Sequence, residues 1–161
     1  MAWVNSLWFM WIWRILTRGE NRYFITFIDD FSKYTTVFCW KNKSGTFEKF
    51  QDFSKEVENQ FGIKIKRIRS DRGHEYESSA INSFVQSLRI IHETTTPYSP
   101  ASNCVVKRKN KTLIKLTNAM LIESGAPLHF WGESILTACH ILNRVPHKKS
   151  HTTPFEMWKK T

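Results

Sequence analysis

The chain has 161 residues, of which 41% are hydrophobic and 24% are charged, with only six Gly and five Pro. This length suits one domain with one core, and the composition excludes collagenous, low-complexity and fully disordered proteins. Twenty-four Lys and Arg oppose 14 Asp and Glu, a formal charge of +10 at pH 7. Such an excess favours a polyanionic partner, with nucleic acid ahead of an anionic membrane.

The N-terminal segment is rich in Trp, with four of the seven Trp within residues 1–16. Its apolar run, residues 7–13, is shorter than the roughly 20 residues of a membrane span. No basic stretch precedes the run, so we expect neither a signal peptide nor a transmembrane span. The three cysteines form no CxxC or Cys/His cluster, which fits reduced thiols in a nuclear or cytoplasmic protein. Residues 1–19 then form either a buried strand or a damaged one, and we interpret them as a degenerate remnant of a first strand ahead of a folded domain at residues 20–161.

The next segments predict a hairpin and a helix. Residues 23–28 and 34–40 are rich in β-formers, and the intervening Asp29-Asp30-Phe31-Ser32 is a turn signal. Apolar residues then recur at spacings of three and four, which predicts an amphipathic helix from a cap at Ser44 to about Gln60. Gly62 ends it. Residues 63–69 alternate Ile with basic residues and predict a strand that stops at Ser70 and Asp71.

The second half of the chain alternates helices with one more strand. A helix capped by Ser78 or Ser79 precedes a short strand at residues 90–94. A long helix spans about residues 102–124 and closes at Gly125, and Pro127 opens a last helix. Strands interleaved with helices after a leading hairpin predict an α/β fold.

Asp71 is the leading candidate for chemistry, because it follows a predicted strand end. A carboxylate there suits a Mg²⁺ ligand, and a backbone-capping Asp in a turn fits the pattern equally well. Asp29 and Asp30 close a hairpin, where Asp is a routine turn residue, so we assign them no metal.

Two basic clusters surround this candidate in the sequence. One face of the long helix has no interleaved acid and presents Lys107, Arg108, Asn110, Lys111 and Lys115. Arg69 and Arg72 add basic groups next to Asp71. A solvated charged face is the simpler interpretation of either cluster alone, and the two together favour non-specific binding to a DNA phosphate backbone.

Several ordered motifs resemble the integrases of copia-type LTR retrotransposons. Residues 22–34, RYFITFIDDFSKY, are similar to the second-strand signature of that family, and residues 69–76, RSDRGHEY, resemble its R-S-D-N-G-G-E-Y. Residues 95–100 and 103–113 resemble T-A-P-Y-T-P-Q-Q-N-G-V-A-E-R-K-N-R-T-L. The family's closing segments match residues 130–131, 142–146 and 153–158, so the similarity covers about residues 20–158.

The resemblance implies a ribonuclease H-like α/β fold, with a five-stranded mixed sheet flanked by helices and a first strand that is damaged here. It also implies a D,D-35-E triad that binds Mg²⁺ or Mn²⁺ for phosphodiester chemistry on DNA. The second family Asp falls on Asp71, and the family Glu falls on Lys107. The first family Asp is absent, since no acidic residue precedes Glu20.

One carboxylate of the three therefore remains. From this we expect a degenerate, catalytically inactive integrase core, in which the metal ions are not retained and Lys107 pairs with Asp71. The alternative is a non-catalytic module that binds DNA or forms a homodimer.

Overall fold

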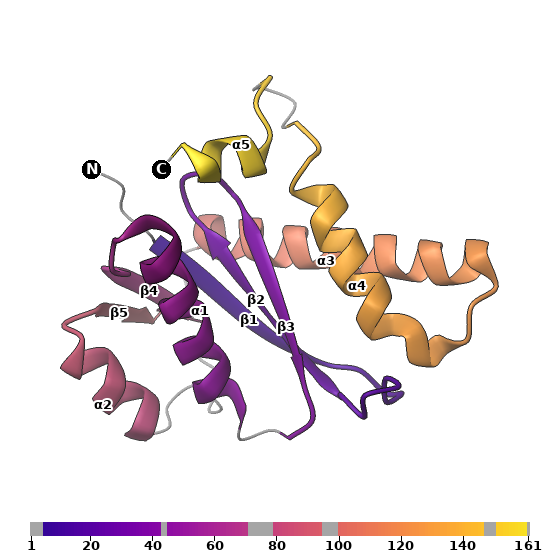
Figure 1. Cartoon of the computed structure of the whole chain (residues 1–161), viewed down its shortest axis with the longest axis horizontal. Coiled ribbons are helices and arrows are strands. Elements are labelled where there is room, and N and C mark those ends of the chain that lie inside the picture. Colours follow the sequence, from indigo (N-terminus) through magenta and orange to yellow (C-terminus); the bar gives the residue numbers. More distant parts are fainter. Residues whose placement is uncertain (1–4, 43–44, 71–78, 95–99, 147–150, 161) are drawn as a thin grey trace.

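The computed structural model describes residues 5–42, 45–70, 79–94, 100–146 and 151–160. One five-stranded sheet, in the order β3-β2-β1-β4-β5, separates two groups of helices (Figure 1). Helices α1 and α2 cover one face, and α3 and α4 cover the other. None of the described helices is both long and apolar enough to cross a membrane.

The first three strands form an antiparallel meander. They are β1 (Asn5–Ile12), β2 (Tyr23–Asp29) and β3 (Thr35–Trp40). β1 occupies the centre of the sheet, antiparallel to β2 and parallel to β4. The expectation of a damaged first strand is therefore wrong for the backbone, because Asn5–Ile12 forms a strand that is paired on both edges.

The parallel part of the sheet is shorter than the sequence predicts. β4 (Arg67–Ser70) and β5 (Ile91–Thr94) each contain four residues. Residues 63–66, expected in the strand, lie outside the ladder, although Ile65 is buried. The alternation of Ile with basic residues indicates which side chains are buried. It does not show whether the backbone joins the ladder, so the predicted strand is too long.

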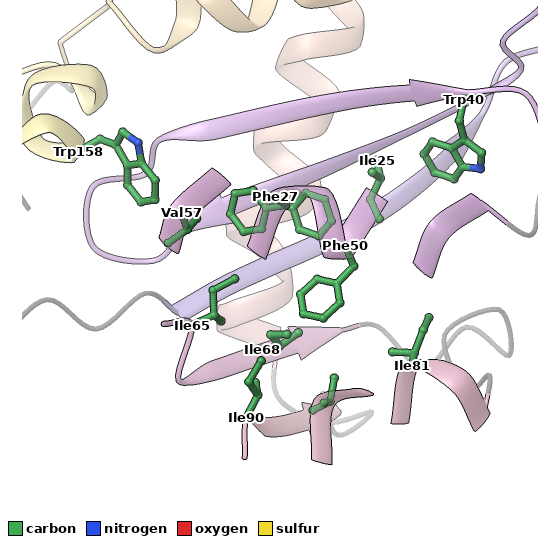
Figure 2. Packing of buried hydrophobic residues seen from close by; sticks show 12 residues of the cluster. Ile25, Phe27, Trp40, Phe50, Val57, Ile65, Ile68, Ile81, Ile90 and Trp158 are labelled. Carbon is green, nitrogen blue, oxygen red and sulfur yellow. The ribbon is translucent and has the colours of Figure 1, made fainter. Parts of the chain in front are cut away.

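A core of aromatic and branched residues fills the space between the sheet and helices α1 (Thr46–Phe61) and α2 (Ser79–Ser87). Figure 2 shows Phe27 of β2 facing Phe50 and Val57 of α1, with Ile68 of β4 below them. The Phe27 and Phe53 rings stack at a centroid distance of 4.4 Å. Gly45 rather than Ser44 is the N-cap of α1, and Gly62 at φ 66° ends it as expected.

On the opposite face, α3 (Pro100–Ser124) and α4 (Trp131–Leu142) cross each other and are joined through the 3-10 turn η3 (Leu128–Phe130) (Figure 1). Trp131, the first residue of α4, is fully buried, and Phe24 of β2 packs against it. The buried stripe of α3 includes Val106, Leu113 and Thr117, as the spacing predicts.

The chain ends in a short helix, α5 (Pro154–Lys159), which starts with a capping box. The Thr153 hydroxyl accepts a hydrogen bond from the Glu156 backbone N–H, and the Glu156 carboxylate accepts one from the Thr153 backbone N–H. Trp158 of α5 stacks on Tyr34 at a centroid distance of 5.1 Å, which holds this helix against the β2–β3 hairpin.

Candidate functional site

The sheet register fixes where β1 could contribute a side chain to a site at the end of β4. Leu7 of β1 pairs with Arg69 of β4 and Ile28 of β2, and Trp8 pairs with Ser70. Because β4 ends at Ser70, Asp71 directly follows a strand end as the sequence predicts. Asp71 and Arg72 themselves lie outside the described residues. The strand that pairs with β4, Asn5–Ile12, contains no Asp or Glu.

Helix α3 brings position 107 to this part of the sheet. α3 lies against β1, and Val106 packs on Ile28, the register partner of Leu7. Lys107 is the next residue along α3 and its side chain is exposed. The helix position that the resemblance gives to a Glu therefore lies beside the Leu7 register and holds an ammonium group.

The basic face predicted on α3 is present, with one correction. Lys107, Arg108, Lys111 and Lys115 are all exposed. Asn110 is not part of this face, since it is only 3% exposed and its Oδ1 accepts a hydrogen bond from the Thr26 hydroxyl at 2.9 Å. Asn110 thus joins α3 to β2, and its side chain is not accessible to a polyanion.

The second basic cluster is partly neutralised. The Glu93 carboxylate on β5 bridges the two β4 arginines, with Arg67 Nη1 at 2.6 Å and Arg69 Nη2 at 3.0 Å. Arg69 is therefore engaged within the sheet rather than free for DNA. Sequence reasoning misses Glu93, because its place beside the two arginines depends on the register of β4 with β5.

Asp29 and Asp30 have the turn roles expected of them. Asp29 Oδ2 accepts hydrogen bonds from the Ser32 backbone N–H at 2.7 Å and the Ser32 hydroxyl at 2.6 Å. Asp30 forms an ion pair with Lys33 at 2.7 Å. Both carboxylates therefore have the turn partners that the sequence predicts.

Two positions that the resemblance gives to metal ligands, one on β1 and one at Lys107, hold no carboxylate. Within the ranges the structure describes, no three His, Cys, Asp or Glu side chains lie close enough together to hold a metal. Mg²⁺ needs oxygen ligands, whereas an ammonium group offers only donors and a positive charge. Neither β1 nor position 107 supplies an oxygen ligand of the kind the triad requires.

A five-stranded mixed sheet with α3 packed against its central strand β1 is the arrangement in which the site candidates lie. Residues 3–100 match the family model described as the integrase core domain, and the chain belongs to that family. The resemblance to copia-type retrotransposon integrases is thereby confirmed.

Similar curated proteins are transposon polyproteins. The chain is 42% identical over 132 residues to the retrovirus-related Pol polyprotein from transposon TNT 1-94 of Nicotiana tabacum, which covers 82% of this chain and 10% of the relative. It is 28% identical over 137 residues to that from transposon RE2 of Arabidopsis thaliana, covering 85% of this chain and 9% of the relative. The chain thus spans about a tenth of the length of these relatives.

Solved structures confirm the α/β fold. The catalytic core domain of BIV integrase superposes with a TM-score of 0.71 at 16% identity, covering 99% of this chain and 95% of that one. The catalytic core domain of HTLV-2 integrase in complex with magnesium, in a dimeric form, gives 0.66 at 20% identity, with 98% of each chain covered.

Proposed function

We propose that this chain is a degenerate integrase core that no longer catalyses polynucleotidyl transfer and that binds the DNA backbone through α3. The observation that carries this proposal is the exposed Lys107 at the helix position of the family Glu. The loss of the β1 acid supports it, since the central strand offers no carboxylate anywhere along its length.

A lysine at position 107 disfavours binding of a divalent metal ion more than a neutral residue would, because it carries a positive charge. Two unit charges 4 Å apart interact by about 4 kcal/mol at an effective dielectric of 20, so an ammonium facing a divalent ion costs roughly twice that. Lys107 can avoid the cost by swinging into solvent, because its stem is long and flexible. Asp71 alone then has to hold the metal, and one carboxylate holds two ions poorly. Where no metal binds, an ion pair between Lys107 and Asp71 replaces it.

Binding to DNA rests on the four exposed cations of α3. They share one helix face of about 100° of arc, separate from the buried stripe that contains Asn110. A helix face of this kind contacts phosphates without reading bases, so we expect little sequence preference. A homodimer without DNA binding is the alternative, and one similar solved structure is described as dimeric.

A salt titration of duplex binding, followed by fluorescence anisotropy, tests the binding half of the proposal. Four phosphate contacts predict a slope of about −3 to −4 in log K against log salt. Lys111→Glu with Lys115→Glu should weaken binding strongly and flatten the slope, whereas Lys55→Glu on the far helix α1 should change it little. A flat plot for the unmodified chain contradicts DNA binding.

A metal titration of a repaired chain tests the catalytic half. Leu7→Asp with Lys107→Glu restores two oxygen ligands beside the end of β4. A substitution at Leu7 keeps the β1 register, whereas an inserted residue would move every following side chain to the other face. We expect Mn²⁺ to raise the Tm of the repaired chain and to leave that of the unmodified chain unchanged. A rise in the unmodified chain that Asp71→Asn abolishes contradicts the proposal.

A further inference from the structure

The connection between β1 and β2, residues 13–22, is anchored tightly to α4; we call it the β1–β2 loop. The Trp13 ring stacks on Trp131 at a centroid distance of 5.0 Å and an interplanar angle of 6°. Trp131 Nε1 donates a hydrogen bond to the Ile15 carbonyl at 2.6 Å. The Arg18 backbone N–H donates to the His129 carbonyl at 3.2 Å. Three separate contacts therefore fix the path of the loop.

Thr17 adds a fourth contact at the centre of the loop. It is buried, and its hydroxyl accepts a hydrogen bond from the Asn21 backbone N–H at 2.9 Å. Its methyl group lies against Gly132 of α4, where an added Cβ would be 2.7 Å from Thr17 Cγ2. This close approach holds Thr17 tightly against α4.

Several aliphatic side chains in this loop and next to it are exposed to solvent. Ile12 is 52% exposed, Ile15 39% and Leu16 43%. Leu128 of η3, the turn that pairs with Arg18, is 54% exposed. A single exposed aliphatic residue is ordinary, whereas several gathered at one end of an ordered fold indicate an interaction surface.

The same loop is strongly basic. Arg14, Arg18 and Arg22 are exposed, and Glu20 is the one acid between residues 12 and 22. Glu20 is itself neutralised by an ion pair with Lys41, which lowers the pKa of its carboxyl. A hollow of about 380 Å³ opens beside the loop, lined by Leu16, Tyr23, Arg22, Asn42 and the Glu20–Lys41 ion pair.

We propose that the β1–β2 loop docks an acidic peptide segment of a partner protein, with an aliphatic side chain in the hollow and carboxylates on the arginines. Charge complementarity favours this occupant over a second copy, because the chain has a formal charge of +10. A membrane surface has no side chain to fill a hollow, and a DNA backbone makes no use of the exposed aliphatics. This surface is separate from the basic face of α3 and does not depend on DNA binding.

Fluorescence anisotropy with a labelled ten-residue peptide of alternating Glu and Leu tests the proposal. We expect saturable binding that the combined variant Ile15→Ser/Leu16→Ser weakens at least tenfold, and that Arg14→Glu/Arg22→Glu weakens by a similar factor. The matched controls, Ile122→Ser for the apolar change and Lys55→Glu for the charge change, should leave the affinity within twofold. Both control residues are exposed and lie on other helices.

Two further peptides and one vesicle separate the competing explanations. A Glu-Ser peptide that binds as tightly as the Glu-Leu peptide shows charge alone and overturns the proposal. Equal binding of a Lys-Leu peptide overturns it as well. If phosphatidylserine vesicles bind through the same residues and the Glu-Leu peptide does not bind, the partner of this surface is a membrane and the proposal is overturned. Circular dichroism of each variant verifies that the fold is retained, and a loss of affinity in a variant with an unchanged spectrum supports the proposal.

Discussion

The hydroxyl of Thr26, in the middle of β2, donates a hydrogen bond of 2.9 Å to Oδ1 of Asn110 in α3. Both residues are buried, so this bond ties the helix with the basic face to the sheet. Replacing Thr26 by the isosteric Val removes the donor and leaves the Asn110 carbonyl without it. We expect the free energy of unfolding, measured with urea, to fall by about 1–3 kcal/mol. Thr36→Val on the neighbouring strand β3 is the control and should cost less than about 0.5 kcal/mol. Equal effects of the two substitutions would contradict this role.

Trp131 holds the β1–β2 loop by its indole nitrogen as well as by its ring. Trp131→Phe keeps an aromatic ring beside Trp13 and removes the donor to the Ile15 carbonyl. We expect a loss of about 1–3 kcal/mol in stability, together with faster hydrogen exchange at the Arg18 amide. Unchanged exchange at residues 14–18 would show that the loop does not depend on this bond.

Glu156 links the stability of α5 to pH. Hydrogen bonds from the Thr153 backbone N–H and hydroxyl hold the pKa of the Glu156 carboxyl below its usual value of 4.5. Because the folded-state pKa is depressed, the stabilisation is complete above about pH 4.5 and is lost as the pH falls through the folded-state pKa. The Tm difference between the native chain and Glu156→Gln should therefore shrink on acidification below that pH. A difference that stays constant from pH 7 to pH 3 would contradict this linkage.

Two cysteines should be unreactive in the folded chain. Burial raises the pKa of the Cys39 and Cys139 thiols to about 12, and the Cys139 thiol also donates to the Thr35 carbonyl at 3.1 Å. At pH 8 only about one thiol in 10⁴ is then a thiolate, which is the reactive form. Peptide mapping after iodoacetamide should find both unmodified in buffer and both modified in guanidinium. Equal rates in the two conditions would contradict protection of these thiols by the fold.

The basic face of α3 shows where sequence periodicity succeeds and where residue chemistry misleads. Lys107, Lys111 and Lys115 follow each other at intervals of four and are exposed as expected. Asn110 was grouped with them because it is polar, yet its spacing places it in the buried stripe of Val106, Leu113 and Thr117. Spacing is the better guide, since the buried amide oxygen of Asn110 accepts its hydrogen bond from Thr26, a residue 84 positions away that local sequence cannot reveal.

Other elements also divide into those that the local sequence predicts and those that it does not. Gly62 and Gly125 both adopt the positive φ that a helix end requires, as predicted from glycine alone. β1 was harder to recognise because its Trp-rich sequence has no alternation, as is usual for a central strand between two neighbours. The bridge from Glu93 to Arg67 and Arg69 depends on the register of β4 with β5, which only the folded sheet defines.

The most direct measurement of lost catalysis is a DNA strand-transfer assay of the unmodified chain with Mn²⁺, beside Asp71→Asn. Labelled short duplexes would be followed for metal-dependent cleavage or joining on a denaturing gel. We predict no metal-dependent product from either protein, because position 107 is a lysine and β1 supplies no carboxylate. A product formed by the unmodified chain and abolished by Asp71→Asn would contradict the assignment of an inactive core.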